Sequence, residues 1–205
     1  MARKAVQQPG QVFVNCPFDA DYAGMFEAII FTVFDCGFVP RCAKEISDSS
    51  EVRINKIQRI VEECKFGIHD LSRTELNENG LPRFNMPLEL GLFLGAKRFG
   101  SGLQKDKVCL VLDLERFRFQ QFISDIAGQD IEAHHGDVQQ CIKVVRKWLN
   151  DASKRKSLPG GREIAYRYAE FREDLPELVY EAGLDLDEVG FNDYSAFAYE
   201  WLRNR

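Results

Sequence analysis

The sequence lacks the cysteine and histidine spacings that mark metal and disulfide sites. Its six cysteines are scattered and none forms a Cys-x-x-Cys pair, so neither a zinc site nor a redox motif is expected. Most of them lie inside apolar runs, where cysteine behaves as a small hydrophobic residue. The adjacent His134 and His135 have no further ligands at a metal-site spacing. We expect reduced thiols and no bound metal.

Long apolar segments and an excess of positive charge are also missing. No window approaches the roughly 18 uncharged apolar residues of a membrane span, and the polar opening MARKAVQQPG has no apolar core of a secretory signal. The net charge of -5 is unfavourable for non-specific contact with nucleic acid or acidic membranes. We therefore expect a cytoplasmic protein with neither a membrane nor non-specific nucleic acid as a partner.

What is present is a regular alternation of short apolar segments and helical patterns. The predicted strands span residues 11–16, 38–41, 66–70, 107–113 and 130–134. The predicted helices span residues 22–36, 51–64, 84–99, 117–126 and 137–149. Such alternation is typical of a parallel sheet with helices on both faces. We predict an α/β, flavodoxin-like fold whose five-stranded parallel sheet has the order 2-1-3-4-5.

The composition divides the chain into two parts. Residues 11–150 form the predicted α/β domain, and residues 151–161 are rich in Ser, Lys, Pro and Gly, as in a linker. Residues 162–205 are helical in pattern and rich in aromatic residues. About 44 residues are too few for a separate core. We expect this C-terminal helical appendage to pack on the main domain or on a second subunit. A homo-oligomer is therefore predicted.

The predicted topology locates a binding cleft. In sheets of this order ligands bind at the carboxyl ends of the strands, where the winding reverses between strands one and three. The loops at that point are residues 15–19 and 69–73, and the helix that contains Glu89 begins after the second loop. The sequence therefore predicts that Glu89 lies near the cleft.

Glu89 is the candidate catalytic residue because it interrupts a helix that is apolar on nearly every face. A mostly apolar helix is usually buried, and a carboxylate there is costly unless it is paired or used. A carboxylate facing a ribose can bind its hydroxyls, stabilise an oxocarbenium-like centre or attack it. The alternative is that Glu89 caps its own helix or pairs with Arg83 or Arg98.

The first loop supplies candidate ligand-binding residues. Asn15, Phe18, Asp19 and Tyr22 follow the first strand. An aromatic ring there can stack on a base. For Phe18 the alternative is a loop residue that covers the core.

Other candidates follow the second and third strands. Asp70 and Ser72 end the third strand, where such residues also cap turns, and Asn85 is a favourable helix N-cap. Arg41, Lys44, Arg73 and Arg83 are expected at the same sheet edge, where they could bind the phosphates of a nucleotide. His69 titrates near neutrality, but its apolar strand favours a core or rim histidine.

Two segments carry a family resemblance. Residues 64–72, an apolar strand ending in Asp-Leu-Ser, and Asn85–Gly91, with the pattern Asn-x-x-x-Glu-Leu-Gly, resemble the motif pair of nucleoside 2-deoxyribosyltransferase-like proteins. The related TIR-like domains have a catalytic Glu on the corresponding helix, and residues 12–18 resemble their opening Phe-Val-x-x-Pro-Phe. The resemblance covers about residues 11–113.

The resemblance implies a TIR-like α/β domain in which Glu89 is the catalytic residue and Asp70 orients the base or the ribose. It implies an N-glycosidase that hydrolyses or cyclises at the nicotinamide–ribose bond of NAD, or acts on a related nucleotide, in the manner of bacterial antiviral defence proteins. NAD or a nucleotide is then substrate, and no cofactor is expected. Two alternatives stay open: a non-catalytic nucleotide-binding or self-assembling signalling module, and a nucleoside 2-deoxyribosyltransferase of salvage.

Overall fold

The predicted sheet is confirmed in a computed structural model that describes residues 10–45, 48–74, 76, 80–153 and 157–205. All neighbouring strands are parallel, in the order β2-β1-β3-β4-β5. The strands are β1 (Gln11–Asn15), β2 (Val39–Arg41), β3 (Phe66–Asp70), β4 (Val108–Asp113) and β5 (Ile131–Ala133). The winding reverses between β1 and β3, as the alternating pattern predicts.

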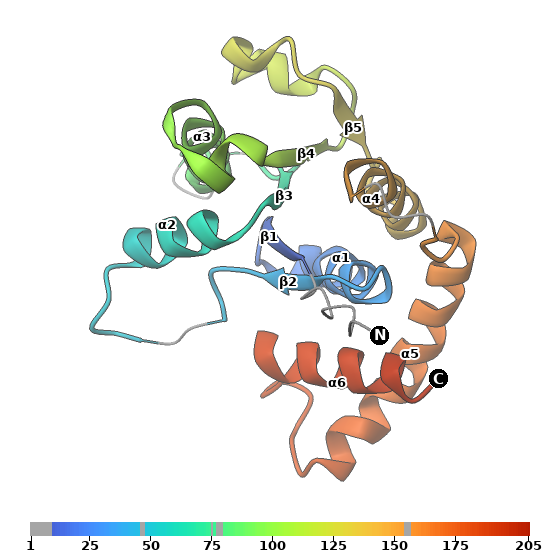
Figure 1. The fold of residues 1–205 in the computed structure, drawn as a ribbon. Coiled ribbons are helices and arrows are strands. Elements are labelled where there is room, and N and C mark those ends of the chain that lie inside the picture. Colours follow the sequence, from blue (N-terminus) through green and yellow to red (C-terminus); the bar gives the residue numbers. More distant parts are fainter. Residues whose placement is uncertain (1–9, 46–47, 75, 77–79, 154–156) are drawn as a thin grey trace, which may run out of the picture.

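Helices cover both faces of the sheet (Figure 1). On one side lie α1 (Ala23–Asp35) and α4 (Val138–Ser153), and on the other lie α2 (Arg53–Glu63) and α3 (Asn85–Phe99). Successive side chains of a strand point to opposite faces. Val12 and Val14 accordingly join the core beneath α1, whereas Phe13 joins the cluster beneath α2.

Gly67 allows α3 to lie close to the sheet. A Cβ atom added at Gly67 would lie 2.9 Å from the ring of Phe93, and 2.8 Å from Nε2 of His69. Only a residue without a side chain therefore lets Phe93, which is fully buried, pack this closely against β3. This contact helps to hold the helix that contains Glu89 against the centre of the sheet.

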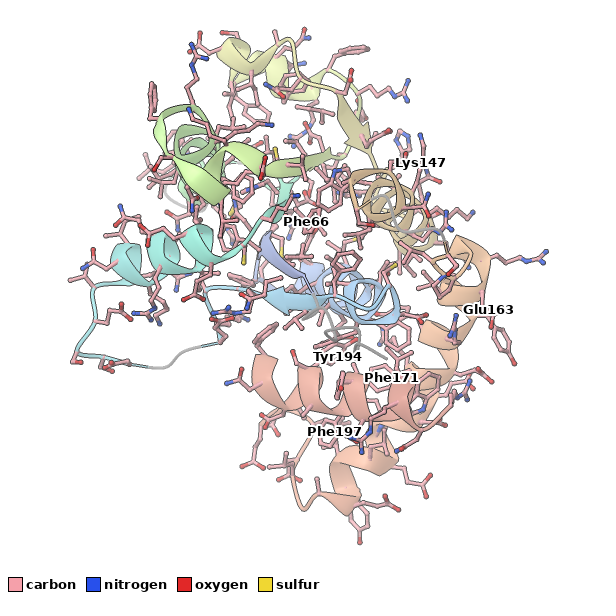
Figure 2. The ribbon with its side chains drawn as sticks, viewed as in Figure 1. Phe66, Lys147, Glu163, Phe171, Tyr194 and Phe197 are labelled. Carbon is pink, nitrogen blue, oxygen red and sulfur yellow. The ribbon has the colours of Figure 1, made fainter. Side chains whose placement is uncertain are left out.

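The C-terminal helices α5 (Gly161–Glu181) and α6 (Phe191–Arg203) form a further layer over α1. The rings of Phe31 and Phe171 stack at 5.3 Å, and Phe171 meets Tyr194 at 5.6 Å. Figure 2 shows Phe171 and Tyr194 between α6 and α1, where the Tyr194 hydroxyl donates to the Glu27 carbonyl oxygen at 3.0 Å. Because α1 is covered on both sides, its apolar face is broader than that of an ordinary surface helix.

Lys107 is a buried cation that joins the start of β4 to the end of α2. Its side chain is 1% exposed, and its ammonium group donates to the carbonyl oxygens of Val61 and Cys64. The last carbonyls of a helix have no partner within the helix. Lys107 supplies that partner and also lies over the ring of Phe93, 4.6 Å from its centroid.

The helix predicted over residues 117–126 is wrong. The structure has two short 3-10 turns there, η3 (Arg118–Gln121) and η4 (Ser124–Ile126). Phe117 adopts a φ of 67°, which a continuing right-handed helix does not permit. Arg118 is also held at the sheet edge, because its guanidinium donates to Asp113 Oδ1 and to the Leu71 carbonyl oxygen. The remaining 3-10 turns are η1 (Ala20–Tyr22) and η2 (Gly102–Asp106).

Two predicted boundaries also need correction. The predicted linker begins inside α4, which continues to Ser153, and residues 154–156 lie outside the described residues. Asn85 is not the N-cap of α3, since Phe84 precedes the helix and no side chain caps it. Asn85 is instead the first helical residue, and Pro87 fits the first turn because its missing N–H has no intrahelical acceptor there. Within the described ranges, no helix is both long and apolar enough to cross a membrane.

Candidate functional site

A cavity of about 390 Å³ opens at the carboxyl end of β1, the strand beside which the winding of the sheet reverses. The first loop, the start of α2 and the start of α3 contribute its walls. Its lining residues are Asn15, Cys16, Pro17, Phe18, Asp19, Arg53, Arg83, Asn85, Met86 and Glu89. Five of the nine predicted site residues are therefore brought together here: Asn15, Phe18, Asp19, Asn85 and Glu89.

Glu89 is a buried carboxylate that faces this cavity. It is 6% exposed, and it lies in the second turn of α3 beside the buried Met86 and Leu90. Among the described residues, none donates a hydrogen bond to its carboxylate or lies within ion-pair distance of it. Burial raises the pKa of the Glu89 carboxyl to about 7, and the charge of Arg53 offsets only part of that rise. Within the described residues, Glu89 therefore neither caps its own helix nor pairs with Arg83 or Arg98, the two alternatives that the sequence left open.

Asn15 fixes the floor of the cavity. Its amide nitrogen donates to the Met86 carbonyl oxygen at 2.9 Å and lies 3.0 Å from Nδ1 of His69. The two bonds tie the end of β1 to the first turn of α3 and to β3. Asn15 is 3% exposed. Its bond to the Met86 carbonyl oxygen helps to fix the position of α3, the helix that contains Glu89.

His69 is a core residue, as its apolar strand predicts. It is fully buried between the rings of Phe13 and Phe93. Since Nδ1 accepts from the amide nitrogen of Asn15, the ring proton is assigned to Nε2. Burial, together with the charge of Lys107, lowers the pKa of His69 to about 3. The imidazole is therefore neutral at physiological pH and lies beneath the cavity rather than in its lining.

Asp70 belongs to a separate buried network and does not line the cavity. The Tyr22 hydroxyl donates to its Oδ2 at 2.5 Å, Nε2 of His134 lies 3.1 Å from the same oxygen, and the Ser72 backbone N–H donates to Oδ1 at 2.7 Å. Although burial opposes ionisation, the nearby imidazole of His134 and the hydrogen bonds from Ser72 and Tyr22 hold the pKa of Asp70 below its ordinary value. The structure thus places Asp70, Tyr22 and Ser72 behind the cavity, where they join the ends of β3 and β5 to η1.

Asp19 holds the mouth of the cavity by ion pairs. Its carboxylate accepts from Arg73 and from Arg83, each at 2.7 Å. Burial opposes ionisation, but these hydrogen bonds and charges lower the pKa of Asp19. The same side chain accepts from the Tyr22 backbone N–H and so caps the start of η1. Arg83 therefore lines the cavity, and its positive charge is partly balanced by the carboxylate of Asp19.

Phe18 supplies the aromatic wall. Its ring meets that of Phe26 edge to face at 5.4 Å, and the Lys44 ammonium lies 4.7 Å from its centroid. The ring is partly exposed and lines the cavity. This position is compatible with both predicted roles, a base-stacking surface and a residue that packs on the core.

Arg41 does not reach the cavity. Its guanidinium donates to Glu45 at 2.7 Å and 2.6 Å and to Glu63 at 2.9 Å. These carboxylates raise the pKa of Arg41, so the side chain is held in a local ion-pair cluster. The structure therefore does not support Arg41 as a phosphate-binding residue.

Arg53 is a charged lining residue that the sequence reasoning missed. It is the first residue of α2 and lies across the cavity from the predicted loops. The signal was available, because the start of the second helix falls at the same sheet edge as the ends of β1 and β3. Comparison of the whole sequence with known protein families and with curated proteins finds no match.

Proposed function

We propose that this protein is an N-glycosidase that acts on the nicotinamide–ribose bond of NAD or on the corresponding bond of a related nucleotide. The observation that carries the proposal is Glu89, a buried carboxylate without a partner among the described residues that faces a cavity at the reversal of the sheet. Burying a carboxylate in this way costs free energy. A ligand group that is cationic or donates hydrogen bonds would offset that cost.

The chemistry suits a single carboxylate. When the bond between C1′ of the ribose and the nicotinamide nitrogen breaks, the electron pair leaves with the base, which becomes neutral. Positive charge develops on the ribose in this oxocarbenium-like transition state. Glu89 would stabilise that charge or attack C1′, and water or an internal nucleophile would then complete hydrolysis or cyclisation with loss of one proton. A carboxylate in a poorly solvated cavity stabilises such a charge more strongly than one in water.

The surrounding residues support the same proposal. The bonds from Asn15 to His69 and Met86 hold the first turn of α3 at the end of the sheet. Phe18 offers a partly exposed ring for the base. The nicotinamide leaving group needs no proton, because it departs as a neutral base, so Glu89 can act without a separate general acid.

The test is incubation of the purified protein with NAD, nucleotides and nucleosides, followed by chromatography for released base, cyclic product or exchanged base. Glu89→Gln removes the charge and should abolish turnover, whereas Glu177→Gln, an exposed residue of α5, should retain it. Because the carboxylate is the active form, kcat/KM should rise with pH through about 7. Equal turnover in both variants, or none in the wild-type protein with any substrate, would refute the proposal.

A specific observation favours a second candidate, a nucleotide-binding module that assembles with itself. The outward face of α3 exposes Leu88 and Phe99, which are 55% and 87% exposed, with the exposed Gly91 between them. Large apolar side chains that are exposed on one helix can contribute to an interaction surface, although the exposed Lys97 and Arg98 lie beside Phe99. Nucleotide-dependent association in analytical ultracentrifugation, without turnover and unchanged by Glu89→Gln, would favour this function over the glycosidase.

A further inference from the structure

We propose that the ligand of the Glu89 cavity carries a phosphate group beside its ribose, and that Arg53 and the N-termini of α2 and α3 hold this phosphate. The inference rests on the proposed function only in taking the ligand to contain a base joined to a ribose. It assigns the class of ligand: nucleotides with a 5′-phosphate are bound, and nucleosides are bound poorly. Arg53 is then the residue that distinguishes the two classes.

The charges around the cavity leave Arg53 available. Among the described residues, those that line it and carry a charge are Asp19, Arg53, Arg83 and Glu89. Arg83 donates to Asp19, which also accepts from Arg73. Within the described residues, Arg53 has no ion pair or hydrogen bond through its side chain, and it is exposed. A guanidinium at the rim of a cavity is well suited to bind phosphate in a bidentate manner.

Two helices begin at this cavity without a side-chain cap. Val52 precedes α2 and Phe84 precedes α3, and in neither case does a side chain accept from the first turn. The first N–H groups of a helix have no acceptor within it, and together with the helix dipole they favour an anion. Both helices lie on the same side of the sheet (Figure 1), and Arg53 and Asn85, their first residues, both line the cavity.

Glu89 is the independent indication that a ligand occupies this space. It is more than nine-tenths buried and faces the cavity, with no partner among the described residues. The carboxylate requires hydrogen-bond donors or a cationic centre, whereas Arg53 and the helix N-termini require an anion. The charge of Arg53 acts on the Glu89 carboxyl, although the two side chains form no ion pair. A 5′-nucleotide meets both requirements, because its ribose separates the glycosidic centre from the phosphate.

The experiment compares AMP with adenosine, which share base and ribose and differ in the phosphate. Isothermal titration calorimetry is performed at low ionic strength on the wild-type protein, Arg53→Gln and Arg59→Gln. Arg59 lies on the same helix, is exposed and pairs with Glu51 at 2.6 Å. Each variant therefore removes one positive charge from α2, but only one removes it from the cavity. Thermal unfolding of each variant checks that the fold is retained.

We expect the wild-type protein and Arg59→Gln to bind AMP more tightly than adenosine. Arg53→Gln should weaken AMP binding by about tenfold to a hundredfold, the loss typical of one charge-assisted hydrogen-bonded contact, and leave adenosine binding unchanged. Equal affinity for AMP and adenosine, equal effects of the two variants, or no binding of AMP would each overturn the inference.

The outcome is distinguishable from failure of the proposed function, because binding is measured without turnover. Arg53-dependent binding of AMP by a protein that releases no base would leave the phosphate site standing and refute the glycosidase. Base release from NAD with the same KM in Arg53→Gln and the wild-type protein would do the reverse.

Discussion

Glu89→Gln should stabilise the protein at alkaline pH and leave its stability nearly unchanged at pH 4. The reason is the burial of a carboxyl group that lacks a partner among the described residues. Glutamine has nearly the same size and carries no charge, so it avoids the cost of a buried ion. A site that keeps such a group for function sacrifices stability, and the substitution should recover it.

The magnitude follows from the pKa of Glu89. Burial raises that pKa from 4.5 to about 7 in the folded protein. Between these values the folded protein holds a proton that the unfolded chain has released, so the free energy of unfolding falls as the pH rises. At about 1.4 kcal/mol for each pH unit, the full difference is about 3 kcal/mol above pH 7. It vanishes below about pH 4, where Glu89 is neutral in both states.

The assay is urea unfolding of the wild-type protein, Glu89→Gln and Glu177→Gln at pH 4, 6 and 8, with linear extrapolation to water. All other titrating groups are common to the three proteins, so the difference between each variant and the wild type isolates the substituted residue. The advantage of Glu89→Gln should grow with pH, whereas Glu177→Gln should show none. An advantage that is independent of pH, or absent at pH 8, would refute the buried, unpaired position of Glu89.

Three further predictions concern the buried polar residues around the site. His69→Gln should lessen the loss of stability on acidification. Below pH 6.5 the unfolded chain binds a proton at His69, whereas the folded protein, in which the pKa of His69 is about 3, does not. Urea unfolding at pH 7 and 4 measures this difference. Lys107→Met should lower the free energy of unfolding by about 1–3 kcal/mol, since it leaves two carbonyl oxygens at the end of α2 without their donor, whereas the exposed Lys147→Met should have little effect. Tyr22→Phe should raise the pKa of Asp70, followed by carboxyl NMR, and lower stability by about 1.5–3 kcal/mol, because it removes a hydrogen bond to an ionised group; an unchanged Asp70 titration would contradict the network.

The order of the sheet could be predicted because it depends on local patterns. Alternating apolar strands and amphipathic helices leave few parallel arrangements, and crossovers in parallel sheets follow a fixed hand. The region between β4 and β5 could not be predicted in this way. There Arg118 bonds to Asp113 and to the Leu71 carbonyl oxygen, contacts that reach across the sheet edge and have no trace in the local pattern of residues 117–126.

The position of the candidate site could be predicted from the sequence, but not which polar residues line it. The end of the first strand and the start of the third helix meet wherever the sheet has this order, which places Asn15 and Glu89 at one cavity. Whether a polar residue at that edge faces the cavity depends on which hydrogen-bond or ion-pair partners lie near it in the folded protein. Asp70 finds Tyr22 and His134 behind it, whereas Arg41 finds carboxylates beside it.

By itself, the sequence determined the parallel sheet, its strand order and the helix that carries Glu89, because periodic burial is written into neighbouring residues. Only the tertiary structure decided which charges remain available. Asp19 pairs with Arg73 and Arg83, which are distant from it in sequence, whereas Glu89 has no partner among the described residues. Such pairings depend on distances of a few ångströms between separate elements, and these distances exist only after the sheet and its helices have packed.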